Sequence, residues 1–374
     1  MKIVLFANTD WFLYNFKLSL AQALRARGDE VILLSPPGEY GPRLHALGFR
    51  WEPLPVSRSG VNPLAELVVI RRISDLYRAW QPDLVHHFTI KCVIYGSFAA
   101  RCVGVRGIVN SVTGLGFALL ANSFKARLIR PVVLALYRLA LRGTQVIFQN
   151  ADNRDTLAGY GVLAKSGVQV IAGDGIDTTR FVPAAQPPDS PVVLMMARLL
   201  YSKGVADFVA AARGVREQLP EVRFLLAGAP DPGNPESVDE SSLAAWRATG
   251  DVEFLGQRSD VLALNQSASV VVLASTQGEG IPRALLEGAA CGVPMVATDV
   301  PGCRDLVVDG VTGLLVSPGA PAQLAAALLR LLRDAALRAQ MGAAARARVE
   351  QTFSDQQVIA QTCAVYQSAL GMRA

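Results

Sequence analysis

The chain has 374 residues, of which 51% are hydrophobic and 18% charged. This length predicts two domains, because an ordinary domain has roughly 100–200 residues. No apolar run reaches the roughly 18 residues that a membrane-spanning helix needs, and Lys2–Ala7 is typical of a buried strand rather than of a signal peptide. The 5 cysteines are scattered and only 3 histidines occur, which disfavours a disulfide framework or a histidine metal site and favours a reducing, cytoplasmic compartment.

Positive charge is concentrated in the first half of the chain. Residues 1–170 carry a formal charge of +10, and residues 171–374 carry −5. No acidic residue lies between Asp83 and Asp152, a stretch that holds 8 basic residues. A one-sided field of this kind favours an anionic partner, whether phosphate, a membrane surface or nucleic acid. Chance and solvated helix faces are the alternative explanation.

Short runs rich in Val, Ile and Leu alternate with helix-length segments along the first half. The expected strands are Lys2–Ala7, Glu30–Ser35, Leu84–Phe88, Gly107–Val112, Gln145–Gln149 and Val168–Ile171. The expected helices include Phe16–Arg27, Leu64–Trp80 and Asn153–Gly159. Continuous apolar strands that alternate with helices predict a parallel sheet covered on both faces.

Three prolines between Ala184 and Pro191 predict a linker, after which the same pattern restarts. The expected strands there are Pro191–Ala197, Val222–Ala227, Val252–Leu255, Val270–Ala274, Pro294–Thr298 and Gly313–Val316, with helices at Val205–Gln218 and Ala284–Cys291. We therefore expect an α/β protein with an N-terminal domain at 1–183 and a C-terminal domain at 192–353. Ser354 suits the cap of a final helix over 354–374, for which a return to the first domain is open.

The segment Gly278–Glu287 directly follows an expected strand. Pro282 suits a first helical turn and Gly280 permits close backbone approach, so this helix start would present free N–H groups to a polar or anionic ligand. Glu279 lies before the helix, and Glu287 lies about a turn and a half inside it, so the two acids would reach a ligand at different depths. Alternatively, Glu279 complements the helix dipole and Glu287 is a solvated helix residue.

Arg198 and Lys203 follow the first strand of the second half, at the edge of its sheet where ligands bind. Two fixed cations there would neutralise a diphosphate without a metal, although surface charges on a loop are the alternative. No Asp-x-Asp pair occurs, so no metal site is expected.

The first turn, residues 8–16, is aromatic and polar and lacks the Gly-x-Gly-x-x-Gly of a dinucleotide-binding domain, which disfavours a nicotinamide enzyme. Its aromatics suit a sugar or lipid head group, or pack an interdomain wall.

Several segments together resemble the retaining glycosyltransferases of family four, whose GT-B fold has two Rossmann-like domains facing across a cleft. The segments are Glu279-x7-Glu287, Arg198 with Lys203-Gly204, Gly175–Phe181, Phe254–Val261, Gly292–Thr298, Pro301-Gly302 and Val311–Val316. The resemblance spans nearly the whole chain, and the order of its motifs is highly specific. Asn8–Trp11 and Asn110–Gly116 resemble the bacterial branch that builds capsule, O-antigen or N-linked glycans on undecaprenyl diphosphate.

The resemblance implies a role for each matching residue on the donor side. Arg198 and Lys203 would hold the donor diphosphate, Glu287 the ribose hydroxyls and Glu279 the transferred sugar. The donor side would be completed by Gly256, Gly280 and Ile281. In retaining members attack is thought to occur on the face that the diphosphate leaves, so no covalent enzyme nucleophile is required. The leaving phosphate can accept the acceptor's proton. The protein then supplies orientation and electrostatic stabilisation.

The implied donor is a UDP-sugar carrying a hexose or an N-acetylhexosamine, used without a cofactor, and the implied acceptor is a saccharide on undecaprenyl diphosphate. The acceptor side would include Asn8, Thr9 and Asp10. The sequence departs from the common family pattern at Asn8-Thr9, where many members have Gly-Gly, and at Thr113, where many have His. His87 or Lys91 would supply polar contacts instead.

Residues 122–142 form an expected amphipathic helix that Pro131 kinks or splits. Its arginines fall within roughly 120° on a helical wheel and are Arg127, Arg130, Arg138 and Arg142. A basic helix without acids is typical of a binder of anionic lipid and predicts a peripheral position on the inner face of the cytoplasmic membrane. A packed Rossmann helix with arginines on its outer face is the alternative.

Two other functions remain open. A nucleotide-sugar epimerase could use the same fold, but the 3 histidines offer little for elimination or hydrolytic chemistry. A basic nucleic-acid-binding protein would explain the positive first half. However, the basic segment has no interleaved aromatic platform and no known nucleic-acid motif, so no nucleic-acid partner is expected.

Overall fold

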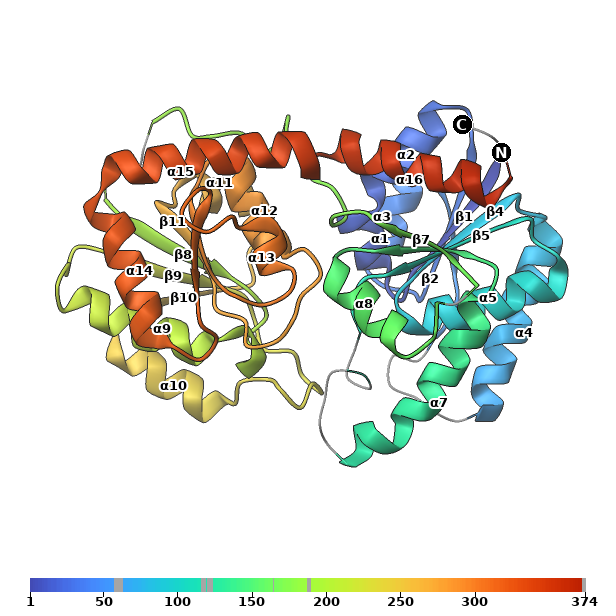
Figure 1. Ribbon diagram of the computed structural model, residues 1–374, viewed down its shortest axis with the longest axis horizontal. Helices are drawn as coiled ribbons and strands as arrows, with labels where there is room; N and C mark the ends of the chain where they lie inside the picture. The colour runs from blue at the N-terminus through green and yellow to red at the C-terminus, as the bar shows by residue number, and fades with distance from the viewer. Residues whose placement is uncertain (57–62, 116–118, 120–123, 164, 187–189, 372–374) are drawn as a thin grey trace. The chain divides into compact units, whose positions relative to one another are not determined.

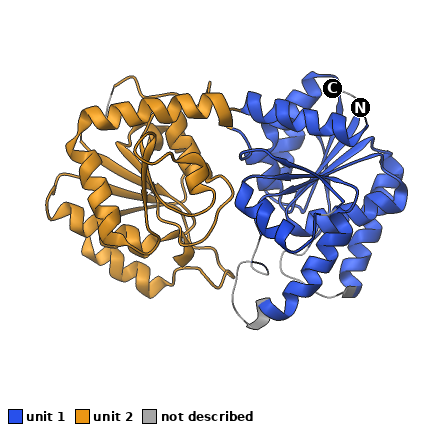
Figure 2. Ribbon diagram, in the orientation of Figure 1, with its two compact units in different colours: residues 1–175, 355–374 blue, residues 176–354 orange. Residues whose placement is uncertain are grey.

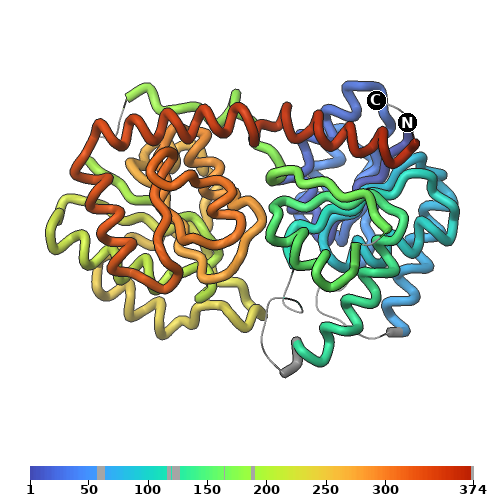
Figure 3. Tube along the Cα trace, in the orientation of Figure 1, coloured from blue at the N-terminus to red at the C-terminus, as the bar shows by residue number. Residues whose placement is uncertain are grey.

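A computed structural model describes residues 1–56, 63–115, 119, 124–163, 165–186 and 190–371 (Figure 1). The chain divides into two compact units (Figure 2). Unit 1 comprises residues 1–175 and 355–374, and unit 2 comprises residues 176–354. The chain therefore leaves unit 1 once and returns to it for its last helix, a path that Figure 3 traces.

Unit 1 is built on a seven-stranded parallel sheet of order β3-β2-β1-β4-β5-β6-β7. The strands are β1 (Lys2–Phe6), β2 (Glu30–Ser35), β3 (Arg50–Pro53), β4 (Leu84–Phe88), β5 (Gly107–Val112), β6 (Gln145–Phe148) and β7 (Gly167–Val170). The helices are α1 (Asp10–Phe16), α2 (Leu18–Ala26), α3 (Gly41–Ala46), α4 (Pro63–Trp80), α5 (Ile90–Val103), α7 (Phe124–Leu141), α8 (Ala151–Gly159) and α16 (Asp355–Ala369). Separate apolar clusters line the two faces of this sheet, so its central strands are buried on both sides.

Unit 2 is a second parallel sheet, with six strands in the order β10-β9-β8-β11-β12-β13. The strands are β8 (Val192–Met196), β9 (Arg223–Ala227), β10 (Glu253–Gly256), β11 (Val270–Leu273), β12 (Met295–Thr298) and β13 (Gly313–Val316). The helices are η1 (Tyr201–Lys203), α9 (Val205–Arg216), α10 (Glu240–Thr249), α11 (Val261–Gln266), α12 (Arg283–Ala290), α13 (Cys303–Leu306), α14 (Pro321–Arg333), α15 (Ala335–Arg348) and η2 (Val349–Phe353). Both units thus have the doubly wound architecture expected from the sequence.

The point at which the chain changes unit differs from the expected linker. The chain passes from unit 1 to unit 2 between Gly175 and Ile176, rather than at the proline-rich segment 184–191. Ile176 donates its N–H to the Phe353 carbonyl oxygen at 3.0 Å and forms a parallel bridge with Ser354, so the outgoing and returning segments pair just inside unit 2. Residues 187–189 of the proline-rich segment lie outside the described part of the chain.

Two other elements differ from expectation. The helix expected at Phe16–Arg27 is α2, and it is preceded by a helix that was not expected, α1. The two helices meet at Lys17, whose Nζ atom lies 2.5 Å from Asp174 Oδ1. The edge strand β3 was not expected at all, because its four residues include two charged side chains and a proline. Among the described residues, no helix is long and apolar enough to cross a membrane.

Candidate functional site

Polar side chains gather on the loops that follow the strands of unit 2. Because the strands are parallel, these loops emerge at one edge of the sheet. Glycine lets the loops touch there: a Cβ atom on Gly204 would lie 1.9 Å from the Ala274 carbonyl oxygen, and one on Gly302 would lie 1.7 Å from that of Gly280. Both glycines also have positive φ angles, 73° and 85°. The loops after β8, β11 and β12 are therefore fixed against one another by close backbone contact.

Lys203 and Glu279 form an ion pair at this edge. Their side chains are only 19% and 18% exposed, respectively. The carboxylate also accepts a hydrogen bond from Ser275 Oγ at 2.6 Å, and the Glu279 N–H donates to the Pro301 carbonyl oxygen at 2.9 Å. A lysine and a glutamate that are 76 residues apart are thereby held together at the end of the sheet.

Arg198 lies in the loop after β8 and is more exposed, with 55% of its side chain accessible. Its Nη1 atom lies 2.5 Å from Asp231 Oδ2, in the loop after β9. The sequence reasoning did not select Asp231, because nothing in the spacing of the two residues indicates that they meet. Gly256, at the end of β10, has a φ angle of 66° and accepts the Gly228 N–H on its carbonyl oxygen at 2.8 Å.

Helix α12 brings the second glutamate to the site. Gly280 and Ile281 precede the helix, and Pro282 is its N-cap, one position earlier than the expected first turn. Glu287 accepts a hydrogen bond from Arg283 Nε at 2.9 Å, and its side chain is mostly buried. Burial raises the pKa of Glu287, although the neighbouring Arg283 and Arg180 oppose the rise. The loops at this edge therefore carry Lys203 and Glu279 beside the start of α12, and Glu287 lies further along that helix; these groups suit a ligand with both phosphates and hydroxyls.

The residues expected on the acceptor side lie in unit 1 and have different environments. Thr9 caps α1 by accepting the Phe12 N–H at 3.1 Å, and Asn8 beside it is half-buried. Asp10 is buried, and its Oδ2 accepts the backbone N–H groups of Tyr40 and Gly41, each at 2.8 Å. The carboxylate of Asp10 therefore holds the turn before α3 rather than facing a ligand.

The expectation that His87 contacts an acceptor is wrong for this structure, because its side chain is fully buried in β4. Its Nδ1 lies 2.8 Å from Asn110 Oδ1 and its Nε2 lies 3.2 Å from the Tyr77 hydroxyl. Burial lowers the pKa of His87 to about 4, despite the hydrogen bond that His87 donates to Asn110, which raises the pKa. Both ring nitrogens are thus used inside the fold.

Of the residues expected on the acceptor side, Lys91 and Thr113 are left. Lys91 lies in the first turn of α5, after β4, and Thr113 directly follows β5. Lys91 donates to Glu66 Oε1 at 2.7 Å, and Thr113 is half-buried. Thr89, which sequence reasoning missed, lies between β4 and α5 with a φ angle of 72°. A β-branched residue in that conformation is strained, and such strain clusters at functional turns.

The four arginines of residues 122–142 do not act alike. Arg127, at the start of α7, is exposed and Arg130 is half-buried. Arg138 donates to the carbonyl oxygens of Tyr160 at 2.8 Å and Gly161 at 3.2 Å, so it ties α7 to the end of α8. Arg142, just after α7, is exposed. Arg138 thus has a place in the packing of unit 1 that a helical wheel does not reveal.

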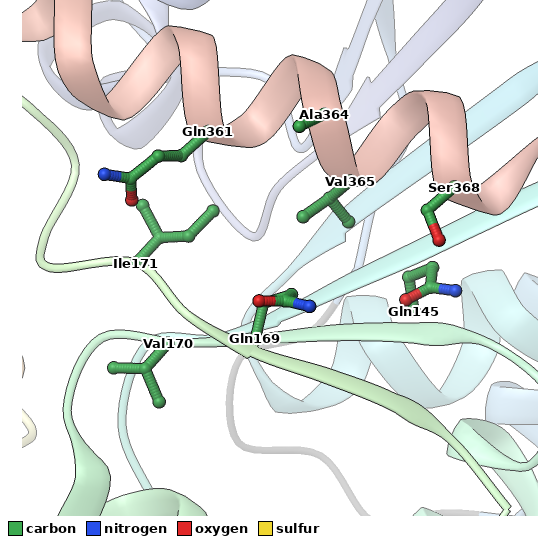
Figure 4. A pocket seen from close by; sticks show the side chains of 8 residues that line it. All are labelled: Gln145, Gln169, Val170, Ile171, Gln361, Ala364, Val365 and Ser368. Atoms are coloured by element: carbon green, nitrogen blue, oxygen red, sulfur yellow. The ribbon is translucent and has the colours of Figure 1, made fainter. Parts of the chain in front are cut away.

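A pocket of about 270 Å³ lies elsewhere in unit 1, between α16 and the edge of the sheet (Figure 4). Its polar lining consists of neutral groups from β6, β7 and α16: Gln145, Gln169, Gln361 and Ser368. None of the residues selected from the sequence lines it. Within the described ranges, no group of three His, Cys, Asp or Glu side chains is placed to hold a metal ion.

Comparison with known proteins places this arrangement in a family. Residues 2–151 match the family model described as Glycosyl transferase 4-like, and residues 177–348 match Glycosyl transferases group 1. A relative from Campylobacter jejuni, the N,N'-diacetylbacillosaminyl-diphospho-undecaprenol alpha-1,3-N-acetylgalactosaminyltransferase, is 29% identical over 375 residues, covering 96% of each protein. The chain is a family-four glycosyltransferase.

Two further similarities support the assignment of the chain to the glycosyltransferases. The capsular polysaccharide biosynthesis glycosyltransferase CapM of Staphylococcus aureus is 25% identical over 315 residues, covering 81% of each protein. The crystal structure of Anabaena Alr3699/HepE in complex with UDP and glucose matches with a TM-score of 0.81 at 21% identity, covering 98% of this chain and 100% of that chain. The two Rossmann-like units of this glycosyltransferase therefore have the GT-B fold.

Proposed function

We propose that this glycosyltransferase moves a hexose or N-acetylhexosamine from a UDP-sugar to a saccharide carried on undecaprenyl diphosphate, with retention of configuration and without a metal. The observation that carries the proposal is the ion pair of Lys203 and Glu279 on the loops that follow the strands of unit 2, with Arg198 on the same loop as Lys203 and Glu287 on the helix that follows Glu279. These residues offer cations for a diphosphate and carboxylates for hydroxyls. The Campylobacter relative acts, by its name, on a diphospho-undecaprenol substrate, and the Anabaena protein binds UDP and glucose.

The donor contacts follow from the chemistry of each side chain. Arg198 and Lys203 bind the diphosphate and stabilise the charge that develops on it as the glycosidic bond breaks. The carboxylate of Glu287 accepts the ribose hydroxyls, and Glu279 binds the transferred sugar. Lys203 already lies against Glu279, so one cation touches both the sugar-binding acid and the leaving group. The N–H groups of Gly280 and Ile281 lie at the helix start beside them.

The chemical step needs no nucleophile from the protein. The acceptor hydroxyl attacks the anomeric carbon from the face that the diphosphate leaves. Its proton passes to a phosphate oxygen of the departing UDP, and the new glycosidic bond forms as the old one breaks. The protein contributes by holding the acceptor hydroxyl beside the leaving diphosphate, on the same face of the sugar, and by neutralising the phosphates.

We also propose that the enzyme works peripherally on the inner face of the cytoplasmic membrane. Exposed apolar side chains support this position, with Leu128 and Val132 of α7 being 70% and 60% exposed, and Leu64 and Leu67 of α4 being 74% and 61% exposed. Both helices pack on α5, and Figure 1 shows their first turns projecting in the same direction from unit 1. Apolar residues next to the exposed Arg127 suit the boundary of an anionic bilayer.

A panel of UDP-, GDP- and ADP-sugars in a thermal-shift assay tests the donor. We expect UDP and one UDP-sugar to raise the melting temperature, because a ligand at 100 times its Kd adds about 2.7 kcal/mol to the free energy of unfolding. Transfer to a polyprenyl-diphosphate saccharide should continue in EDTA, with the anomeric configuration of the product equal to that of the donor. Stabilisation by GDP- or ADP-sugars alone, activity that EDTA abolishes and Mn²⁺ restores, or an inverted product would each overturn the corresponding part of the proposal.

A further inference from the structure

The loop after β9 is bound to the segment that carries Arg198. The Leu199 N–H donates to the Ala229 carbonyl oxygen at 3.0 Å, and the Val238 N–H donates to the Leu199 carbonyl oxygen at 2.9 Å. The loop begins at Gly228, where a Cβ atom would lie 1.8 Å from the Ala197 carbonyl oxygen. Residues 228–238 therefore follow the Arg198 segment closely, and the position of the loop is set by backbone contacts.

This loop holds a carboxylate against the arginine. Asp231 Oδ2 lies 2.5 Å from Arg198 Nη1 and accepts a second hydrogen bond from Asn234 Nδ2 at 3.3 Å. The Asp231 N–H donates to Ser237 Oγ at 3.1 Å, so the acid is anchored within its own loop. The Asp231 side chain is 26% exposed, whereas that of Arg198 is 55% exposed. The acid is thus the fixed partner and the arginine the more accessible one.

A bound diphosphate would need the same guanidinium. Phosphate oxygens and a carboxylate both prefer the planar fork of Arg, and both are anions. A carboxylate within hydrogen-bonding distance of that fork competes for its N–H groups and repels the phosphates that approach it. Asp231 has no assigned part in sugar or ribose binding, unlike Glu279, the carboxylate paired with Lys203.

Resting on the proposed function, we propose that Asp231 is a built-in competitor for Arg198 that weakens the binding of the donor's diphosphate and speeds the release of UDP after transfer. The negative charge of Asp231 determines how strongly it competes for Arg198. The ion pair between them breaks when the donor diphosphate binds Arg198, and it forms again when UDP leaves. Asp231 acts through Arg198 and is a positioning residue, not a catalytic one.

Asp231→Asn tests this proposal, because the amide keeps the size of the side chain and one acceptor oxygen but loses the charge. By isothermal titration calorimetry we expect UDP to bind the full-length variant roughly threefold to tenfold more tightly than wild type. Stopped-flow measurements should show slower UDP dissociation. Both differences should shrink as salt is added, since exposed charges are screened. In an Arg198→Ala background the same substitution should change the Kd by less than about twofold, because the competition no longer exists.

Glu253→Gln is the matched control, since Glu253 pairs with Arg223 through two 2.8 Å contacts at the amino ends of β10 and β9, the opposite edge of the same sheet. Its UDP affinity should equal that of wild type. Equal or weaker UDP binding by Asp231→Asn would overturn the inference, weaker binding showing instead that the carboxylate orients Arg198 for the phosphate. If wild type itself binds neither UDP nor any UDP-sugar, the proposed function fails and the inference fails with it.

Discussion

The two sheets are wound alike, but they use polar residues in opposite ways. In unit 1, polar side chains lie inside the strands: β4 carries His86 and His87, and β5 carries Asn110 and Ser111, all buried. In unit 2, the central strands β8 and β11 are entirely apolar, and the polar groups begin on the loops beyond them. The units also differ in formal charge, +9 for unit 1 and −4 for unit 2.

The difference separates polar groups that hold the fold from polar groups that we propose bind the donor. His86 lies 2.7 Å from both the Tyr366 hydroxyl on α16 and Ser111 Oγ, so the buried network of unit 1 fastens the last helix to the sheet. In unit 2 the comparable chemistry lies on exposed or half-buried loops. We therefore expect substitutions in the first set to reduce stability, and substitutions in the second set to reduce activity.

The largest effect should be the acid sensitivity of unit 1. With a folded-state pKa of about 4 against an ordinary value of 6.5, His87 is kept neutral by folding, whereas the unfolded chain takes up the proton first. Stability is therefore complete above pH 6.5 and is lost as the pH falls toward 4, by about 3 kcal/mol. Thermal melting followed by tryptophan fluorescence checks this, since Trp11, Trp51 and Trp80 lie in unit 1 and only Trp246 in unit 2.

His45→Gln provides the control for that experiment. His45 is exposed on α3, so its loss should leave the pH dependence of melting unchanged. A melting temperature that stays flat between pH 7 and 4.5 in the wild-type protein would contradict the role given to the buried histidines.

A smaller effect, on activity alone, is expected for Lys203→Ala. Loss of one charge-assisted contact to phosphate is worth about 1.5–3 kcal/mol, so kcat/KM should fall roughly tenfold to a hundredfold. Arg223→Ala, at the opposite edge of the same sheet, should leave kcat/KM near that of wild type. If the melting temperature of Lys203→Ala fell far enough to explain the lost activity, the claim that this loop residue affects activity rather than stability would be wrong.

The smallest effect compares two arginines of one helix. Arg127→Gln should lower binding to anionic vesicles about fivefold, because a basic residue near such a surface contributes about 1 kcal/mol. Arg138→Gln should instead lower the melting temperature, since its guanidinium bonds the end of α8. Co-sedimentation and thermal melting measured on both variants distinguish the two roles. If the two variants showed equal losses of vesicle binding and equal melting temperatures, the proposed difference between Arg127 and Arg138 would be wrong.

The sequence predicts the sheets well and the side-chain environments poorly. Leu84–Phe88 could be predicted as a strand because it is short and has apolar residues at both ends. The same sheet explains why His87 was misplaced: where helices cover both faces, a strand histidine is buried whichever way it points. Glu279 and Lys203 could be predicted as site residues from the sequence because they lie in motifs beside strand ends. Asp231 could not be predicted, because its contact with Arg198 depends on the conformation of the loop after β9.

The return of the chain to unit 1 has a consequence for synthesis. Residues 176–354 are contiguous, so unit 2 is complete as soon as it leaves the ribosome. Unit 1 begins first but lacks α16, whose Tyr366 lies against His86, until the last residues are made. Unit 1 is thus started first and completed only after unit 2, and during most of translation the face of its sheet that α16 covers lacks this helix.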